Sequence, residues 1–135
     1  MSAWLLPTFG YLIGVGFMGV IAKLALRTIE WQQLVLWVAI AYAFFALGFA
    51  LFGGVRLPLG AGGGWAALMA FIAAGSLILL FVALSKGEAS RVVPIAASYP
   101  ALTLLASAFI LSERITPLRV AGTLLVIGGV VLLSR

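Results

Sequence analysis

The sequence predicts an all-α polytopic membrane protein with five transmembrane helices. Of its 135 residues, 65% are hydrophobic and 8% are charged, whereas a soluble domain carries roughly 25% charged residues. The apolar residues fall into five runs, and about 20 such residues cross a bilayer as a helix. Because backbone groups in lipid must pair within their own segment, and the alternating polarity of a barrel strand is absent, these runs are expected to be helices.

The five spans are predicted at residues 4–26, 34–52, 65–84, 92–111 and 118–133. The connecting segments carry the charges, the glycine clusters and a proline, and they are too short to form a domain outside the membrane. Residues 1–135 are therefore predicted to be one transmembrane domain. The predicted loops are Arg27–Glu30, a glycine-rich stretch from Gly53 to Gly64 that includes Pro58, Lys86–Glu88, and Ser112–Pro117.

The basic residues divide almost evenly between the two sides of the membrane. Three are predicted on the N-terminal side (Arg56, Arg114 and Arg119), and five on the other (Lys23, Arg27, Lys86, Arg91 and Arg135). The positive-inside rule slightly favours an outside N-terminus. So small a bias also permits insertion in both orientations.

The composition argues against several classes of protein. The chain has no Cys and no His, and its three carboxylates are Glu30, Glu88 and Glu113. A nucleophile–base pair, a phosphate loop and metal-ligand spacing are all missing, so neither an enzyme nor a metal or cofactor site is expected. The net charge of +5 comes from basic residues placed singly between apolar runs, which predicts a lipid bilayer and not a nucleic acid as the partner.

Lys23 is the one charge well inside a predicted span. Gly16, Gly19 and Lys23 share one face of the first helix, which would form a groove leading to an ammonium. Such a groove suits an anionic or carbonyl-bearing ligand, or a coupling role. The alternative is that Lys23 extends to the interface or pairs structurally.

The fourth span is the least regular. Pro94 and Pro100 each remove a backbone donor, so this helix is expected to kink or break. Polar residues that accompany the break would line a substrate cavity, or would only satisfy freed carbonyls or a neighbouring helix. They are Ser98, Tyr99, Thr103 and Ser107.

Two further sets of residues have predicted roles. Gly122, Gly128 and Gly129 in the last span would allow another helix to approach closely, which predicts a dimer interface there. Most of the tryptophans lie near span ends, as interfacial anchors do. Trp37 lies deeper and is a candidate pocket wall.

Several of these residues resemble a known family. The segments Ala83-Leu84, Gly87, Ala89-Ser90, Tyr99-Pro100 and Ser112-Glu113-Arg114 resemble the EamA-like module of the drug/metabolite transporter superfamily. Glu113 follows Pro100 by 13 residues, which is the family's spacing. In the first span, Gly16, Val20 and Lys23–Leu26 are also similar to the family pattern.

The resemblance implies a function and an assembly. Such a protein would move small metabolites or drug-like solutes by alternating access across a bacterial-type inner (plasma) membrane. Most family members carry two inverted five-span modules, so this single module is expected to work as a homodimer, with an antiparallel arrangement permitted by the charges. The alternative is a non-transporting membrane subunit, either a scaffold or a partner of a heteromeric transporter or lipid-linked sugar flippase.

Overall fold

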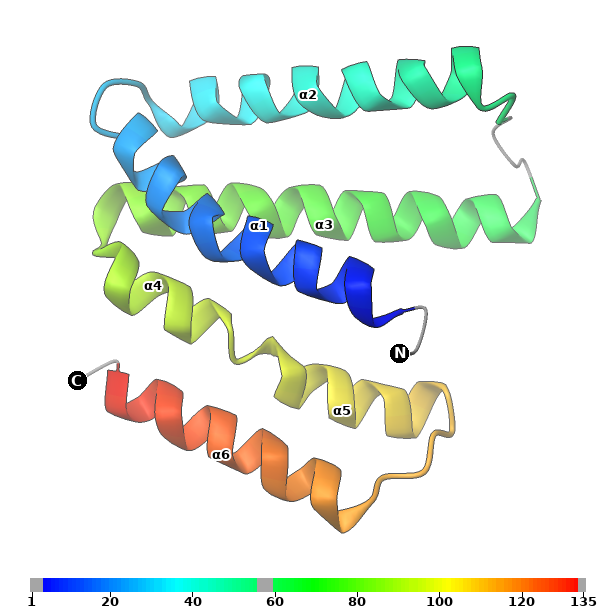
Figure 1. The fold of residues 1–135 in the computed structure, drawn as a ribbon, viewed down its shortest axis with the longest axis vertical. Helices are drawn as coiled ribbons and strands as arrows, with labels where there is room; N and C mark the ends of the chain where they lie inside the picture. Colours follow the sequence, from blue (N-terminus) through cyan, green and yellow to red (C-terminus); the bar gives the residue numbers. More distant parts are fainter. Residues whose placement is uncertain (1–3, 56–59, 134–135) are drawn as a thin grey trace. The chain divides into compact units, whose positions relative to one another are not determined.

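The computed structural model describes residues 4–55 and 60–133, which form helices joined by turns and contain no strand (Figure 1). Four stretches are long and apolar enough to cross a membrane, and a shorter apolar helix follows. The predicted all-α, polytopic class with five spans is therefore confirmed. The helices are α1 Leu5–Ala25, α2 Trp31–Phe52, α3 Ala61–Lys86, α4 Ala89–Ala96, α5 Tyr99–Ile110 and α6 Pro117–Leu133.

The contacts between helices divide the chain into two compact units. The N-terminal unit is Met1–Lys86 and the C-terminal unit is Gly87–Arg135. In the N-terminal unit α3 packs against both α1 and α2, and in the C-terminal unit α6 packs against both α4 and α5. Each unit is therefore built around one helix that contacts the other two.

The second helix begins at Trp31, earlier than the predicted span. Its N-cap is Glu30, whose backbone N–H donates to the Gln33 side-chain oxygen at 2.9 Å, as in a capping box. The hydropathy of the sequence placed Gln33 outside the span because it is polar. The capping geometry places it inside the helix.

The prediction that the whole glycine-rich stretch up to Gly64 forms a loop is wrong. Helix α3 begins at Ala61, and the N–H groups of Gly63 and Gly64 donate to the Gly60 carbonyl at 2.9 and 3.3 Å. Glycine costs a helix roughly 1 kcal/mol per residue relative to alanine. In an apolar setting that cost is smaller than the penalty of leaving backbone groups unpaired. The predicted loop residues Arg56 and Pro58, like Arg135, lie outside the described residues.

The predicted break in the fourth span is present. Helix α4 ends at Ala96, α5 begins at Tyr99, and together they make the spanning stretch Ala89–Ile110 (Figure 1). Pro100 has no N–H to donate to Ala96. The backbone instead forms a tighter turn at Ser98, whose N–H donates to the Ile95 carbonyl, three residues earlier, at 3.1 Å. Pro94 lies inside α4 without ending it.

The turn after α5 contains a strained residue. Ser112 has a φ of 53°, and the next residue, Glu113, donates its N–H to the Ser107 carbonyl at 3.2 Å. A non-glycine residue in this left-handed region costs roughly 1–2 kcal/mol.

Ser112→Gly is therefore expected to raise the free energy of unfolding by about 1 kcal/mol, because glycine adopts this φ without steric cost. Thermal unfolding in detergent micelles, followed by circular dichroism, measures the effect. Ser85→Gly inside α3 is the matched control and should lower stability instead. A lower unfolding midpoint for Ser112→Gly would show that the turn is not strained.

Candidate functional site: an apolar cavity between three helices

The N-terminal unit contains an apolar cavity of about 480 Å³ along its three helices, and this cavity is widely open on one side, since Ile21, Tyr42 and Phe45 in its wall are 62%, 69% and 62% exposed. On α1 and on α2 the lining residues follow the same spacing of four, three, one and three positions, which places them on one face of each helix. Among the lining residues, Tyr42 carries the polar side-chain group. The wall consists of Gly14, Met18, Ile21, Ala22 and Ala25 from α1, Leu34, Val38, Ala41, Tyr42 and Phe45 from α2, and Leu77 and Phe81 from α3.

The most deeply buried side chains lie near the C-terminal ends of α1 and α3. We call this part of the N-terminal unit its Lys23 end. Ala22 is 5% exposed, Phe81 is 2% exposed and Leu84 is fully buried. Most residues in the first halves of α1 and α3 are exposed instead. Tight packing of the N-terminal unit is therefore concentrated at the Lys23 end.

Lys23 joins α1 to α3 at this end. Its ammonium donates a hydrogen bond to the backbone carbonyl of Leu84 at 2.7 Å, and the contact is partly buried. Leu84 lies in the last turn of α3, where carbonyls have no partner within the helix and a nearby cation is favourable. This geometry supports the structural-pairing interpretation of Lys23.

The predicted glycine groove does not line the cavity. Lys23 follows Gly14 by nine residues, so at 3.6 residues per turn it lies on the opposite side of α1 from that cavity residue. Gly19 is buried, whereas Gly16 is exposed and has no atom within 4 Å of an added Cβ. The predicted groove and the α1 part of the cavity wall therefore lie on different sides of that helix.

In the C-terminal unit, two of the predicted hydroxyls bond to their own helix. Thr103 donates to the Tyr99 carbonyl at 3.2 Å, and Ser107 donates to the Leu104 carbonyl at 3.1 Å. Neither of these two bonds reaches the carbonyl of Ser90 or Ala96, which Pro94 and Pro100 leave without a helical donor. The exposed side chains of this set are Tyr99 and Thr103, and the half-buried ones are Pro94, Ser98, Pro100 and Ser107.

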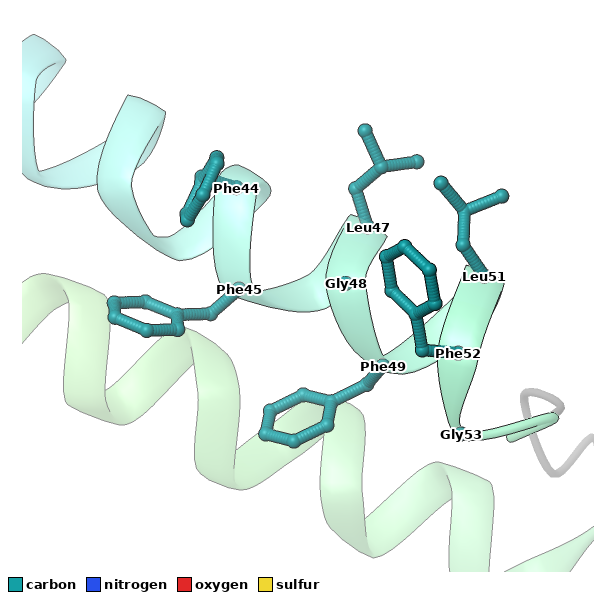
Figure 2. A pocket seen from close by; sticks show the side chains of 8 residues that line it. All are labelled: Phe44, Phe45, Leu47, Gly48, Phe49, Leu51, Phe52 and Gly53. Atoms are coloured by element: carbon teal, nitrogen blue, oxygen red, sulfur yellow. The ribbon is translucent and has the colours of Figure 1, made fainter.

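Trp37 and a second depression lie on α2. The Trp37 side chain is 65% exposed and is not part of the cavity wall. The depression, about 560 Å³, is formed by the C-terminal part of α2 alone, with Phe45 and Phe49 pointing toward the neighbouring helix (Figure 2). A hollow on a single helix does not enclose a solute. Its lining residues are Phe44, Phe45, Leu47, Gly48, Phe49, Leu51, Phe52 and Gly53.

The glycines of α6 border open space. A Cβ added to Gly122, Gly128 or Gly129 would meet no atom within 4 Å. Gly122 and Gly128 are exposed, and Gly129 is half-buried. Gly122 and Gly129, two turns apart, therefore leave open space on one face of α6, and Gly128 leaves it on another.

Residues 4–55 and 60–133 contain no group of three His, Cys, Asp or Glu side chains that could hold a metal ion.

Two parts of the site were not predicted from the sequence, Tyr42 and the Leu84 carbonyl. Tyr42 is the one hydroxyl at helical spacing among the apolar residues of α2, and this was the available signal. A backbone carbonyl leaves no signal in a sequence.

Comparison with known proteins places this architecture in a family. The model of the EamA-like transporter family matches residues 2–135. An uncharacterized protein of Methanocaldococcus jannaschii is 47% identical over 60 residues, which are 44% of this chain and 43% of that protein. The match thus spans less than half the length of this relative, and no solved structure matches. Because the family match extends over nearly the whole sequence, the chain belongs to the EamA-like transporter family and is a multi-pass membrane protein.

Proposed function

We propose that the chain transports small, largely apolar metabolites or drug-like solutes, and that the three-helix cavity forms part of their path. The cavity carries this proposal. Its volume of about 480 Å³ falls within the range of about 300–1,000 Å³ typical of small-molecule sites. Its wall is apolar apart from Tyr42, so a solute with an apolar body and one hydrogen-bonding group fits its chemistry.

The broken fourth span is proposed separately, within the C-terminal unit, as an element that contacts the solute. Discontinuous helices line substrate sites in several transporter folds, because their ends present backbone groups to a solute. The break between α4 and α5 is flanked by Ser98, Tyr99 and Pro100. Pro94, Thr103 and Ser107 are proposed with them. Lys23, Gly16, Gly19 and Trp37 lie outside the cavity wall, and a contribution from them is proposed on the other faces of α1 and α2.

The transporter is proposed to work as a homodimer in a bacterial-type inner (plasma) membrane, by alternating access. These 135 residues supply one five-span module, and α6 presents Gly122, Gly128 and Gly129 on open space. Small residues let helices approach closely in lipid. The near-even distribution of basic residues favours an antiparallel pair.

Solute flux into liposomes tests the proposed function. The purified chain is reconstituted, and uptake of amines, amino acids and drug-like cations is compared with uptake by protein-free liposomes. Transport predicts protein-dependent, saturable uptake of at least one class. If a folded, reconstituted chain moves none of them and co-purifies with an obligate partner, the non-transporting subunit is the better description.

The antiparallel arrangement has a separate test. A reporter fused to the C-terminus is expected to be found on both sides of the membrane in intact cells. A reporter confined to one side would contradict dual insertion and indicate a parallel dimer or a different partner chain.

A further inference from the structure

The cavity of the N-terminal unit is a groove that opens sideways along α1 and α2. Both helices pack against α3, which contributes Leu77 and Phe81 to the wall. On the open side, Ile21, Tyr42 and Phe45 line the cavity and are exposed. In a helix that spans a membrane, an exposed apolar surface borders the hydrocarbon of the lipids and not water. The groove is therefore accessible to a molecule that is already dissolved in the bilayer.

The groove has the depth of one leaflet. On α1 its wall runs from Ala25 to Gly14, which is eleven positions. On α2 it runs over the same number of positions, from Leu34 to Phe45. At about 1.5 Å per residue each wall is about 16 Å long, and half of a hydrocarbon core of about 30 Å is about 15 Å. Because Ala25 is the last residue of α1 and Gly14 lies near its middle, the groove extends from the membrane surface to about the middle of the bilayer.

The surface end of the groove carries a net positive charge. Arg27 lies in the turn between α1 and α2, two residues after the last wall residue of α1, and it is exposed. Lys23 and Lys86 lie at the same end of the unit. The acidic residue of this end, Glu30, belongs to the capping box at the start of α2. Three basic residues thus stand against one acidic residue at the level of the lipid headgroups.

We propose that the groove holds one acyl chain of an anionic phospholipid from the leaflet at the Lys23 end. The acyl chain lies along the apolar wall, and the phosphate is placed beside Arg27 at the surface. Basic residues at a membrane surface attract anionic headgroups, and basic pockets between transmembrane helices bind them. A water-soluble solute would need neither the sideways opening nor the leaflet depth. A solute that uses the cavity displaces this acyl chain, and that exchange rests on the proposed function, whereas the lipid binding does not.

Photolabelling with two lipids that differ in their headgroup tests the proposal. The protein is reconstituted in phosphatidylcholine vesicles with a trace of phosphatidylglycerol, or of phosphatidylcholine, that carries a photoreactive diazirine in its acyl chain. Mass spectrometry after irradiation gives the amount of lipid attached to α1 and α2. The anionic lipid is expected to label these helices about fivefold more, the preference that one basic residue at a membrane surface provides. Equal labelling by the two lipids would overturn the proposal.

Substitutions of Arg27 test the position of the headgroup. Arg27→Gln is expected to remove the preference for the anionic lipid, whereas Arg27→Lys keeps the charge and should retain it. Arg114→Gln removes an exposed guanidinium from the turn after α5 in the C-terminal unit and should leave the labelling of α1 and α2 unchanged. Where Arg27→Gln does not give a monodisperse, helical protein, high salt takes its place, because salt screens this attraction. A preference that survives Arg27→Gln or high salt would overturn the placement of the headgroup.

Filling the groove distinguishes a bound acyl chain from lipid that merely surrounds the protein. Ala41 lines the groove, and Ala39, two residues earlier on α2, lies outside its wall. Both alanines are exposed, so each position has room for a larger side chain. Ala41→Trp is expected to lower labelling by the anionic lipid to the level of the neutral lipid, and Ala39→Trp should leave it unchanged.

An equal effect of Ala41→Trp and Ala39→Trp would overturn the groove as the lipid site. No solute is present in these measurements, so the failure of the lipid site is distinguishable from a failure of the proposed transport function.

Discussion

Replacing Gly14 by Trp is expected to lower solute flux at least about tenfold, a loss equivalent to roughly 1.4 kcal/mol. Gly14 lines the cavity, and a Cβ added there meets no atom within 4 Å. A large side chain therefore has room to enter the cavity without displacing the backbone. The indole would occupy space that a solute needs.

Gly10→Trp is the matched control for this experiment. Gly10 lies one turn earlier on α1, also has open space around an added Cβ, and does not line the cavity. Its flux is expected to stay close to that of the unchanged chain. Initial uptake rates in liposomes of equal protein content measure both variants. Equal inhibition by the two substitutions would remove the cavity from the solute path.

Replacing Phe81 by Ala is expected to give the largest loss of stability, about 3 kcal/mol. The ring is 2% exposed and is held at the Lys23 end. In lipid the helices associate through van der Waals packing and hydrogen bonds, with no aqueous hydrophobic drive between them. The cost therefore arises chiefly from the packing contacts that the new void removes.

Phe71→Ala provides the comparison on the same helix. Phe71 is 80% exposed in α3, so its removal is expected to change stability by no more than about 0.5 kcal/mol. Unfolding by sodium dodecyl sulfate in mixed micelles, followed by circular dichroism, gives both values. Similar losses for the two variants would contradict the concentration of packing at the Lys23 end.

The spans were predictable because crossing lipid imposes a length and a composition that few other structures share. The ends of the helices were less predictable, because they depend on hydrogen bonds that the hydropathy of the sequence does not reveal. Gln33 belongs to α2 because its side chain accepts the capping bond from the Glu30 N–H. Gly63 and Gly64 belong to α3 because their N–H groups donate to the Gly60 carbonyl. The break near Pro100 was predictable because proline removes a donor whatever the surroundings.

The site was less predictable than the fold. Lys23 stands out in the sequence as an isolated charge, but its acceptor is a backbone carbonyl 61 residues away. The cavity wall is made of ordinary apolar residues. In helices that are apolar on every side, hydropathy gives no contrast between a residue of the cavity wall such as Ala41 and a residue outside it such as Ala39. Only the packing of three helices distinguishes them.

Reversible blockage of the cavity shows directly whether solute passes along α1, α2 and α3. Flux by the Ala41→Cys chain is measured before and after treatment with a bulky methanethiosulfonate reagent, and again after reduction. Flux is expected to fall on modification and to return on reduction, whereas flux by the Ala39→Cys chain is expected to stay unchanged. Full flux through a chain with a completely modified Ala41→Cys thiol would contradict passage along these helices.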